Sequence, residues 1–391
     1  MKQLLYIILF VASPLFCFGQ QEYFKIENTR ENDFRVKDLG TRLSESYSEG
    51  NNHVFLNTIQ PDRFFPKVVL HDDNNKKLNK FNKSFKTDFK TKLTSFPNEL
   101  ITDLKNGDFY NFVSYHYDPI DKTYHIVFRY YSEQYGLDYH DYRILKTNDT
   151  LIIDDVFIYS SCQKLSETIK LFYLSELPKN YINSFTSKPE YKYILMLKNF
   201  VDAKNNNQLN KAYKHISLLD KSLQQKDRFT AMLKLELSRS ISDEAYFESM
   251  EDVLQNFTID PSINLSAIRY HYLNKDYEAV FKSINSIQNH TNDSFLDFEK
   301  GNLSFAVKNY ESAEVFYKNM IENYPKFHLP KFSLLVIYEN EKAFVNATQL
   351  LAIILNTSTY KKSTLIKKVK EQLPQIANSS EFNAWAKKQS R

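Results

Sequence analysis

Residues 301–325 read GNLSFAVKNYESAEVFYKNMIENYP, a pattern typical of two short helices joined by a polar turn. Ala313 lies in the second helical segment, three residues after Tyr310 and four before Tyr317, so that all three share one helical face. Pro325 closes the unit. Alanines recur at the same place at intervals of 33, 34, 34 and 34 residues, at Ala212, Ala245, Ala279, Ala313 and Ala347. This period predicts a repeated helix–turn–helix unit.

The period and its supporting residues resemble the tetratricopeptide (TPR) repeat, in which small residues lie where the two helices of a unit cross. Gly301 is the small residue of the first helix in the unit quoted above. The third unit matches less well, because Tyr277 precedes Ala279 by two residues instead of three. The resemblance implies that residues 186–391 form about five TPR-like repeats and a C-terminal cap, arranged as an all-α superhelical solenoid.

The TPR resemblance also implies a concave groove that binds an extended peptide or a helix of a partner protein. The groove positions, carried onto this sequence, are Arg239, Arg269, Tyr272, Asn302 and Phe305, followed by Val336 and Glu339. A pair such as Arg269 and Asn302 is suited to hold a carboxylate of the partner. The alternative is that these are ordinary solvated side chains.

The first half of the chain has a different composition. No alanine occurs between Ala12 and Ala203, whereas fourteen occur from Ala203 onward, which indicates two domains with different packing. Residues 20–180 predict an α+β domain, because helical periodicity gives way after Gly107 to a period of two. The period of two predicts an antiparallel meander with strands at Phe109–Tyr117, Thr123–Tyr131, Leu137–Lys146 and Leu151–Tyr159.

Helices followed by a long aromatic meander resemble the cone-shaped fold of the nuclear transport factor two-like (SnoaL-like) superfamily. The best-matching stretches are GLDYHDY at 136–142 and IIDDVFIY at 152–159. The resemblance implies a pocket on the concave face of the sheet, where enzymatic relatives place an Asp–His pair for general acid–base catalysis. His125 or His140 with Asp154 would be that pair. The alternative is that the polar residues of the meander lie on a solvated outer face.

Several classes of function are excluded or unsupported. The six glycines form neither G-x-G-x-x-G nor a P-loop, which excludes nucleotide binding by either route. The nine histidines form no local metal motif, so the sequence predicts no metal site, and it predicts no cofactor. A net charge of +4 is too small for a nucleic-acid-binding surface over the whole protein. The Lys76–Lys92 segment is basic and suits contact with an anionic surface, but the sequence favours an ordinary amphipathic helix with its lysines in water.

The first nineteen residues predict export. Lys2 precedes the apolar run 4–18, and Cys17 and Gly19 are the small residues expected before a signal-peptidase site, so cleavage is expected after Gly19. Bulky residues before Cys17 disfavour a lipoprotein. The run is shorter than the roughly 20 residues of a transmembrane helix, and no later run approaches that length. A signal peptide of this kind predicts a periplasmic or secreted protein.

Together these observations favour an exported scaffold that binds a partner protein or peptide through the TPR-like groove, without catalytic turnover. The alternative, from another class, is a cone-fold enzyme or small-ligand binder that uses the meander pocket and has the solenoid as a docking arm. A pocket in which His125 or His140 reaches Asp154 would favour the enzyme. Phenylalanine and tyrosine side chains filling that pocket would count against it.

Overall fold

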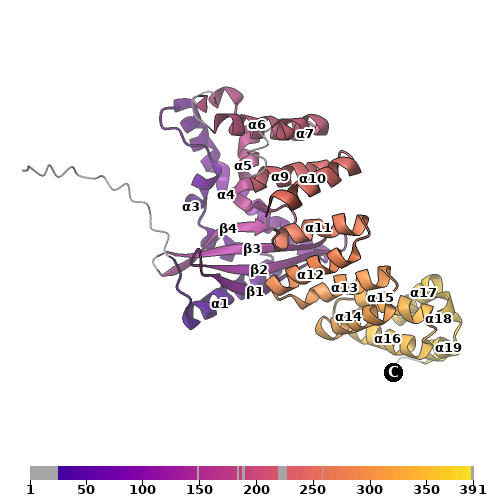
Figure 1. The fold of residues 1–391 in the computed structure, drawn as a ribbon. Helices are drawn as coiled ribbons and strands as arrows, with labels where there is room; N and C mark the ends of the chain where they lie inside the picture. Colours follow the sequence, from indigo (N-terminus) through magenta and orange to yellow (C-terminus); the bar gives the residue numbers. More distant parts are fainter. Residues whose placement is uncertain are drawn as a thin grey trace, which may run out of the picture.

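The computed structural model describes residues 25–147, 149–182, 185–186, 190–218, 227–257 and 259–388. The predicted leader, residues 1–19, lies outside these ranges. The N-terminal part is α+β and the C-terminal part is helical, which confirms the predicted fold class in its coarse form (Figure 1).

In the described chain from residue 25 onward, four helices come before the sheet: α1 (Arg30–Ser48), α2 (His53–Ile59), α3 (Pro61–Val68) and α4 (Lys76–Asn106). Thr29 caps α1 by accepting a hydrogen bond from the backbone N–H of Asn32, and Gly107 ends α4 in the left-handed region at φ 106°. After the sheet come α5 (Leu165–Glu176) and a short 3₁₀ helix, η1 (Lys179–Tyr181).

The sheet is an antiparallel meander in which each strand pairs with the next one in the chain. Its strands are β1 (Phe109–Asp118), β2 (Thr123–Ser132), β3 (Gly136–Thr147), β4 (Thr150–Ile158) and β5 (Gln163–Lys164). The first four are the predicted strands, and β5 is a short addition. Irregularities between Phe112 and Ser114 and between Arg143 and Ile144 shift the pairing locally.

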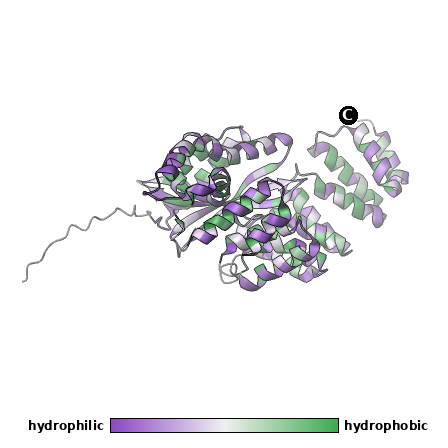
Figure 2. Ribbon diagram, turned by 90° about the horizontal axis from the view of Figure 1, so that it is seen from above, coloured by the Kyte–Doolittle hydropathy of each residue, from purple (hydrophilic) through white to green (hydrophobic). Residues whose placement is uncertain are grey.

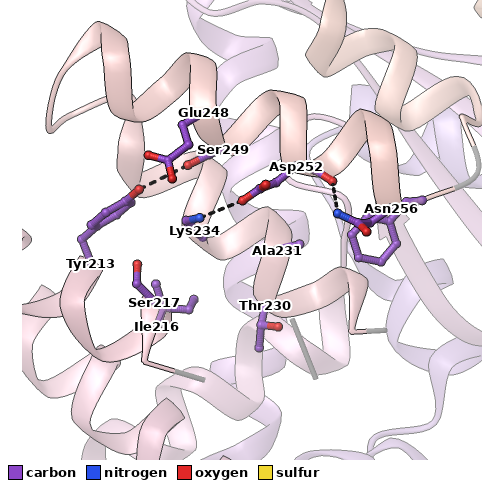
Figure 3. A pocket seen from close by; sticks show the side chains of 11 residues that line it. Tyr213, Ile216, Ser217, Thr230, Ala231, Lys234, Glu248, Ser249, Asp252 and Asn256 are labelled. Atoms are coloured by element: carbon purple, nitrogen blue, oxygen red, sulfur yellow. Dashed lines mark hydrogen bonds and ion pairs between the residues drawn. The ribbon is translucent and has the colours of Figure 1, made fainter. Parts of the chain in front are cut away.

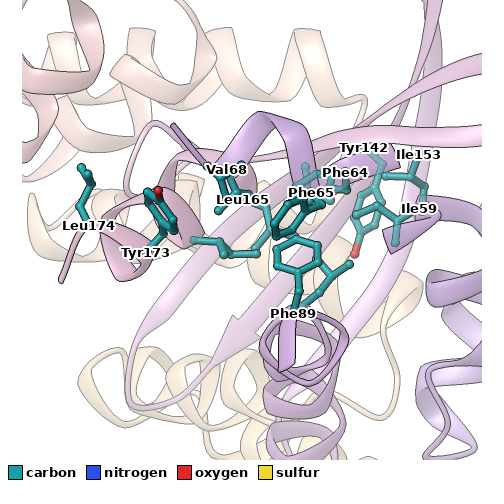
Figure 4. Close-up of a cluster of buried hydrophobic side chains, with 14 of the residues drawn as sticks. Ile59, Phe64, Phe65, Val68, Phe89, Tyr142, Ile153, Leu165, Tyr173 and Leu174 are labelled. Carbon is teal, nitrogen blue, oxygen red and sulfur yellow. The ribbon is translucent and has the colours of Figure 1, made fainter. Parts of the chain in front are cut away.

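The two faces of the sheet carry different side chains because residues alternate along each strand. One face, with Tyr124, Ile126 and Phe128 of β2, packs on the N-terminal helices. Figure 4 shows part of this core, in which Phe64 and Phe65 of α3 lie close to Phe89 of α4. The opposite face packs on the C-terminal helices: Val127 and Tyr139 share a cluster with residues of α12 and α13, and Tyr131 contacts Phe295. Both faces of the sheet are therefore covered.

The C-terminal part consists of successive helices, most of them in antiparallel pairs. They are α6 (Tyr191–Asn205), α7 (Leu209–Ser217), α9 (Arg228–Ser238), α10 (Asp243–Asn256), α11 (Pro261–Leu273), α12 (Tyr277–Thr291), η3 (Ser294–Leu296), α13 (Asp297–Ala306), α14 (Tyr310–Asn323), α15 (Leu329–Asn340), α16 (Phe344–Thr357), α17 (Lys362–Gln372), α18 (Pro374–Asn378) and α19 (Ser380–Lys387). Each pair packs on the next, and hydrophobic and hydrophilic residues alternate around the helices (Figure 2). Within the described ranges, no helix combines the length and apolar character needed to span a bilayer.

Each alanine of the periodic series lies in the second helix of a pair. Ala212, Ala313 and Ala347 are fully buried as the fourth residue after the N-cap. In α10 and α12 that fourth position is held by Tyr246 and Val280, both buried, so the series is one residue out of register there. Gly301 permits the close approach of α13 and α14, because a Cβ at this position would lie 2.6 Å from the ring of Tyr317.

Candidate functional site

The face of the sheet that would line a cone-fold pocket is filled by aromatic side chains. The Tyr110 and Phe128 rings stack at 5.1 Å, and Phe128 lies 4.9 Å from Tyr142. The Tyr142 hydroxyl is 2.9 Å from that of Tyr110 and 3.3 Å from that of Tyr47. Burial raises the pKa of all three tyrosines, so their hydroxyls stay neutral. These side chains occupy the space that a substrate would need.

His140 lies on this aromatic face. Its Nδ1 is 3.0 Å from the Tyr110 hydroxyl, and its ring packs 5.4 Å from that of Phe96. The side chain is buried. His140 is therefore part of the packed core of the N-terminal domain.

Asp154 is bound by two cations instead of a histidine. Its carboxylate accepts hydrogen bonds from Lys67 Nζ at 2.6 Å and from Arg143 Nη1 at 3.1 Å. These groups line a cavity of about 640 Å³ beside β3, β4 and α5, whose other charged residues are Lys25, Asp121, Asp155, Lys164, Glu167 and Lys170. Basic and acidic side chains nearly balance there.

The predicted pairing of His125 or His140 with Asp154 is wrong in this fold. The register places Arg143 opposite His125 and His140 opposite Phe128, so the two histidines point to opposite faces of the sheet. His125 instead contacts Asp141, with 2.8 Å between Nδ1 and Oδ1.

His125 is part of a group of four residues, His116, His125, Asp141 and His290, called here the histidine cluster. His116 on β1 lies directly opposite His125, and their parallel rings are 4.9 Å apart. His290, in the last turn of α12, places its ring 4.9 Å from that of His116. One donor atom each from His116, His125 and Asp141 lies within 4.8 Å of the other two. Three strands and one C-terminal helix thus meet at this cluster.

The environment of the histidine cluster shifts its pKa values in different directions. Burial lowers the pKa of His116 to about 4 and also lowers that of His290. Burial acts in the same direction on His125, but the charge and hydrogen bond of Asp141 outweigh it and raise the pKa of His125. Among the described residues, His116 Nδ1 is buried without a hydrogen-bond partner. At neutral pH His116 is therefore an uncharged imidazole whose Nδ1 is unused.

A second polar group connects the same face of the sheet to the C-terminal part. Arg129 Nη1 donates to Asp293 Oδ1 at 2.6 Å, and the Tyr139 hydroxyl donates to the other oxygen of Asp293 at 2.8 Å. The guanidinium also lies 4.1 Å from the Phe295 ring. Asp293 stands in the turn between α12 and α13, so this network fixes the sheet on that turn.

Two of the predicted groove residues lie close together. Arg239, at the end of α9, and Arg269, on α11, place their guanidinium carbons 5.6 and 5.5 Å from the centre of the Tyr246 ring. Both arginines are exposed, and neither forms an ion pair within the described part of the chain. Tyr272 is 47% exposed and packs against Tyr277.

Three further groove positions are engaged by other residues of the C-terminal helices. Asn302 accepts a hydrogen bond from the Tyr317 hydroxyl at 3.0 Å, and Phe305 packs on Tyr310. Glu339 is buried and accepts hydrogen bonds from the backbone N–H groups of Gln375 and Ile376, both at 2.7 Å. A carboxylate at the start of a helix satisfies free N–H groups there, so the groove assignment of Glu339 is wrong.

A cavity of about 360 Å³ lies between α7, α9 and α10 (Figure 3). Lys234 and Asp252 form a 3.0 Å ion pair in it, and the Tyr213 hydroxyl lies 3.5 Å from that of Ser249. None of the predicted groove residues lines this cavity.

The lysine-rich part of α4 has the geometry of an amphipathic helix packed on its own domain. Phe85 and Phe89 are buried in the core, and Phe81 packs against it. Lys86 pairs with Asp62 and Lys92 with Glu176. The phenylalanine side chains therefore pack inside the N-terminal domain and are not available to contact an anionic surface.

No family model, no curated protein and no solved structure matches the chain. Function is therefore inferred from the chemistry of the residues above.

Proposed function

We propose that this chain is an exported scaffold whose C-terminal part is a TPR-like solenoid that binds an acidic segment of a partner protein. The observation that carries the proposal is the convergence of Arg239 and Arg269 on the Tyr246 ring. These arginines come from neighbouring helix pairs, both are exposed, and neither is paired with an acidic residue in the described ranges.

The repetition of one turn supports the solenoid. The turns between the helices of four pairs contain a residue with positive φ, at Asn207, Lys275, Lys308 and Lys342. In each turn this residue and the next donate their backbone N–H groups to carbonyls near the end of the first helix, as in Lys308 to Phe305 and Asn309 to Ser304. Units that share their internal geometry and contact mainly their neighbours are typical of repeat proteins.

The chemistry of arginine supports an acidic partner. A guanidinium over an aromatic ring keeps its N–H donors at its edge, from which it binds a carboxylate in bidentate fashion. Two such groups on one tyrosine suit a segment with two acidic residues, or with one acidic residue and a terminal carboxylate. Asn302 is less suited to this role, because its carbonyl oxygen already accepts the bond from Tyr317.

The export and domain assignments rest on the sequence. The proposal takes residues 1–19 as a signal peptide, residues 20–180 as the α+β domain and residues 186–391 as the repeat domain, with the mature protein periplasmic or secreted. For the N-terminal domain, a nuclear transport factor two-like fold is supported by the order of its elements, with helices before consecutive antiparallel strands. The competing enzyme function has less support, since aromatic side chains fill the face that would form its pocket.

A peptide titration tests the proposal. The probe is a short fluorescein-labelled peptide of alternating Glu and Ala, compared with a Lys/Ala peptide of equal length, and the readout is fluorescence anisotropy with the mature chain. We expect the acidic peptide alone to bind, with affinity that falls as salt is added. The double variant Arg239→Ala/Arg269→Ala should bind roughly tenfold more weakly or worse, since a hydrogen bond to a charged group contributes about 1.5–3 kcal/mol.

The matched control removes two positive charges elsewhere on the repeats. Lys282→Ala/Lys318→Ala changes exposed residues of α12 and α14 and lowers the net charge equally. It should bind the acidic peptide as the wild type does. Equal losses in the two double variants would show a general charge effect, and no binding by the wild type would remove the proposed recognition of acidic segments.

A further inference from the structure

We propose that the histidine cluster is a binding site for a divalent transition-metal ion, with Zn²⁺ as the best fit, in which His116, His125 and Asp141 of the sheet and His290 of α12 are the ligands. The site would tie the α+β domain to the repeat domain. This inference does not depend on the proposed recognition of acidic peptides.

The backbone places the first three ligands together. His116 of β1 and His125 of β2 form a cross-strand pair. Asp141 of β3 pairs with Val127 of β2, two residues after His125, so Asp141 and His125 are diagonal neighbours on the same face of the sheet. Their donor atoms are within 4.8 Å of one another. A tetrahedral zinc ion with bonds of about 2.1 Å holds its ligand atoms about 3.4 Å apart, so small side-chain rotations would close the site.

The donor types fit this metal class. Three imidazoles and one carboxylate are ligands that Zn²⁺ accepts in proteins, whereas Ca²⁺ and Mg²⁺ prefer oxygen donors alone. His116 Nδ1 is buried without a hydrogen-bond partner in the described residues, an arrangement that costs free energy unless something binds there. A metal ion would satisfy this atom.

The contact between His125 and Asp141 fits the same interpretation. Nδ1 of His125 and Oδ1 of Asp141 are 2.8 Å apart with a proton between them. A metal ion that replaces this proton would bind both atoms at once, and ligand binding by a deprotonated donor set is the normal behaviour of such sites. The nearby cation Arg143 is held away by Asp121 and Asp154, at 3.1 Å each.

His290 is the ligand that gives the site its structural consequence. It lies in the last turn of α12, and its ring already contacts that of His116. The neighbouring hydroxyl of Ser114 on β1 donates to the backbone carbonyl of Thr291 at 2.6 Å, so β1 and the end of α12 are already held side by side. Four protein ligands describe a closed, structural site.

The test uses Zn²⁺ alone, titrated calorimetrically into the tag-free full chain after removal of metal with EDTA. We expect one ion per chain, a rise in melting temperature on binding, and the visible absorption of tetrahedral Co²⁺ when cobalt replaces zinc. His116→Ala and His290→Ala should each weaken binding at least as much as the roughly 10- to 100-fold caused by loss of an outer hydrogen-bond partner of a ligand. Circular dichroism of each variant checks that it is folded.

The control variant is His215→Ala. His215 lies in the last turn of α7, as His290 does in α12, but away from the cluster. It should bind Zn²⁺ as the wild type does. Absence of saturable binding to the wild type would overturn the proposal, and so would a His215→Ala loss equal to that of His290→Ala. If His290→Ala bound like the wild type, the tie to α12 would be wrong.

Discussion

Arg129 of β2 and Asp293, in the turn between α12 and α13, form an ion pair of 2.6 Å in which both side chains are almost fully buried. Its partners come from sequence positions 164 residues apart. The pair therefore belongs to the contact between the sheet and the C-terminal helices and not to either part alone.

Removal of one partner leaves the other as an uncompensated buried charge. Asp293→Ala should lower the free energy of unfolding by about 3–5 kcal/mol, measured by urea denaturation. Arg42→Ala, which breaks the exposed pair of Arg42 with Asp38, should change it by about 0–1 kcal/mol. The double variant Arg129→Ala/Asp293→Ala should lose less than the sum of the two single variants. Strict additivity would show that the two charges do not act as a pair.

Gly301→Ala should destabilise the C-terminal helical part by about 1–3 kcal/mol, because the new methyl group would lie 2.6 Å from the ring of Tyr317. Thermal unfolding followed by circular dichroism measures the effect. Adding Tyr317→Leu removes the obstructing ring and should make the glycine-to-alanine change less costly. If the cost of the alanine were the same in both backgrounds, the contact with Tyr317 would not be its cause.

The succession of helices in the C-terminal part was predictable from the sequence, because the alanine series marks a recurring position in each second helix. The register of the series was not predictable at two places. The N-caps of α10 and α12, Ser242 and Asp276, each accept a hydrogen bond from the alanine of the series, at Ala245 and Ala279. These alanines are therefore the third helical residue, and the buried fourth position falls on the next residue. The spacing of the alanines does not reveal that a helix starts one residue earlier or later.

The histidine cluster could not be predicted for a different reason. His116 and His125 are nine residues apart on neighbouring strands, and only the turn between them decides that they face each other. His290 comes from α12, and its place depends on how the C-terminal helices pack on the sheet. Short sequence motifs detect metal ligands that lie on the same helix or strand. They do not detect a cluster whose residues come from four different elements. The pairing of Asp154 with Lys67 of α3 could not be predicted for the same reason, because the two residues lie on different elements far apart in the sequence.

The turns between the paired C-terminal helices give a further prediction. Lys308 has a φ of +63° between α13 and α14, a conformation that glycine adopts without steric cost. Lys308→Gly should stabilise the protein by about 1 kcal/mol, since a left-handed conformation costs an ordinary residue about 1–2 kcal/mol. Chemical denaturation measures the gain. Lys318→Gly, within α14, should instead destabilise by about 1 kcal/mol. A loss in both variants would contradict the turn geometry.

The lowered pKa of His116 predicts acid sensitivity in the metal-free protein. Its pKa falls from the ordinary 6.5 to about 4 mainly because burial disfavours the charged ring. The positive charges of His125 and His290 act in the same direction, and Asp141 and Asp118 oppose them. A group with a lowered pKa in the folded state binds protons more readily when unfolded, so its contribution to stability is complete above pH 6.5 and is lost as the pH falls toward 4. The raised pKa of His125 has the opposite sign, because its contribution is complete at low pH and is lost as the pH rises through its folded value.

His116→Gln removes the acid-sensitive group and keeps a polar side chain of similar size. In EDTA, the melting temperature of the wild type should fall more between pH 7 and pH 4.5 than that of His116→Gln. At low pH the imidazole of His116 takes up a proton when the wild type unfolds, which favours the unfolded state, and the glutamine variant lacks this group. His53→Gln, at the exposed start of α2, controls for the loss of a histidine as such and should follow the wild type. Parallel curves for wild type and His116→Gln would mean that His116 is as easily protonated in the folded chain as in the unfolded one, and the burial of its ring against β2 and α12 would then be incorrect.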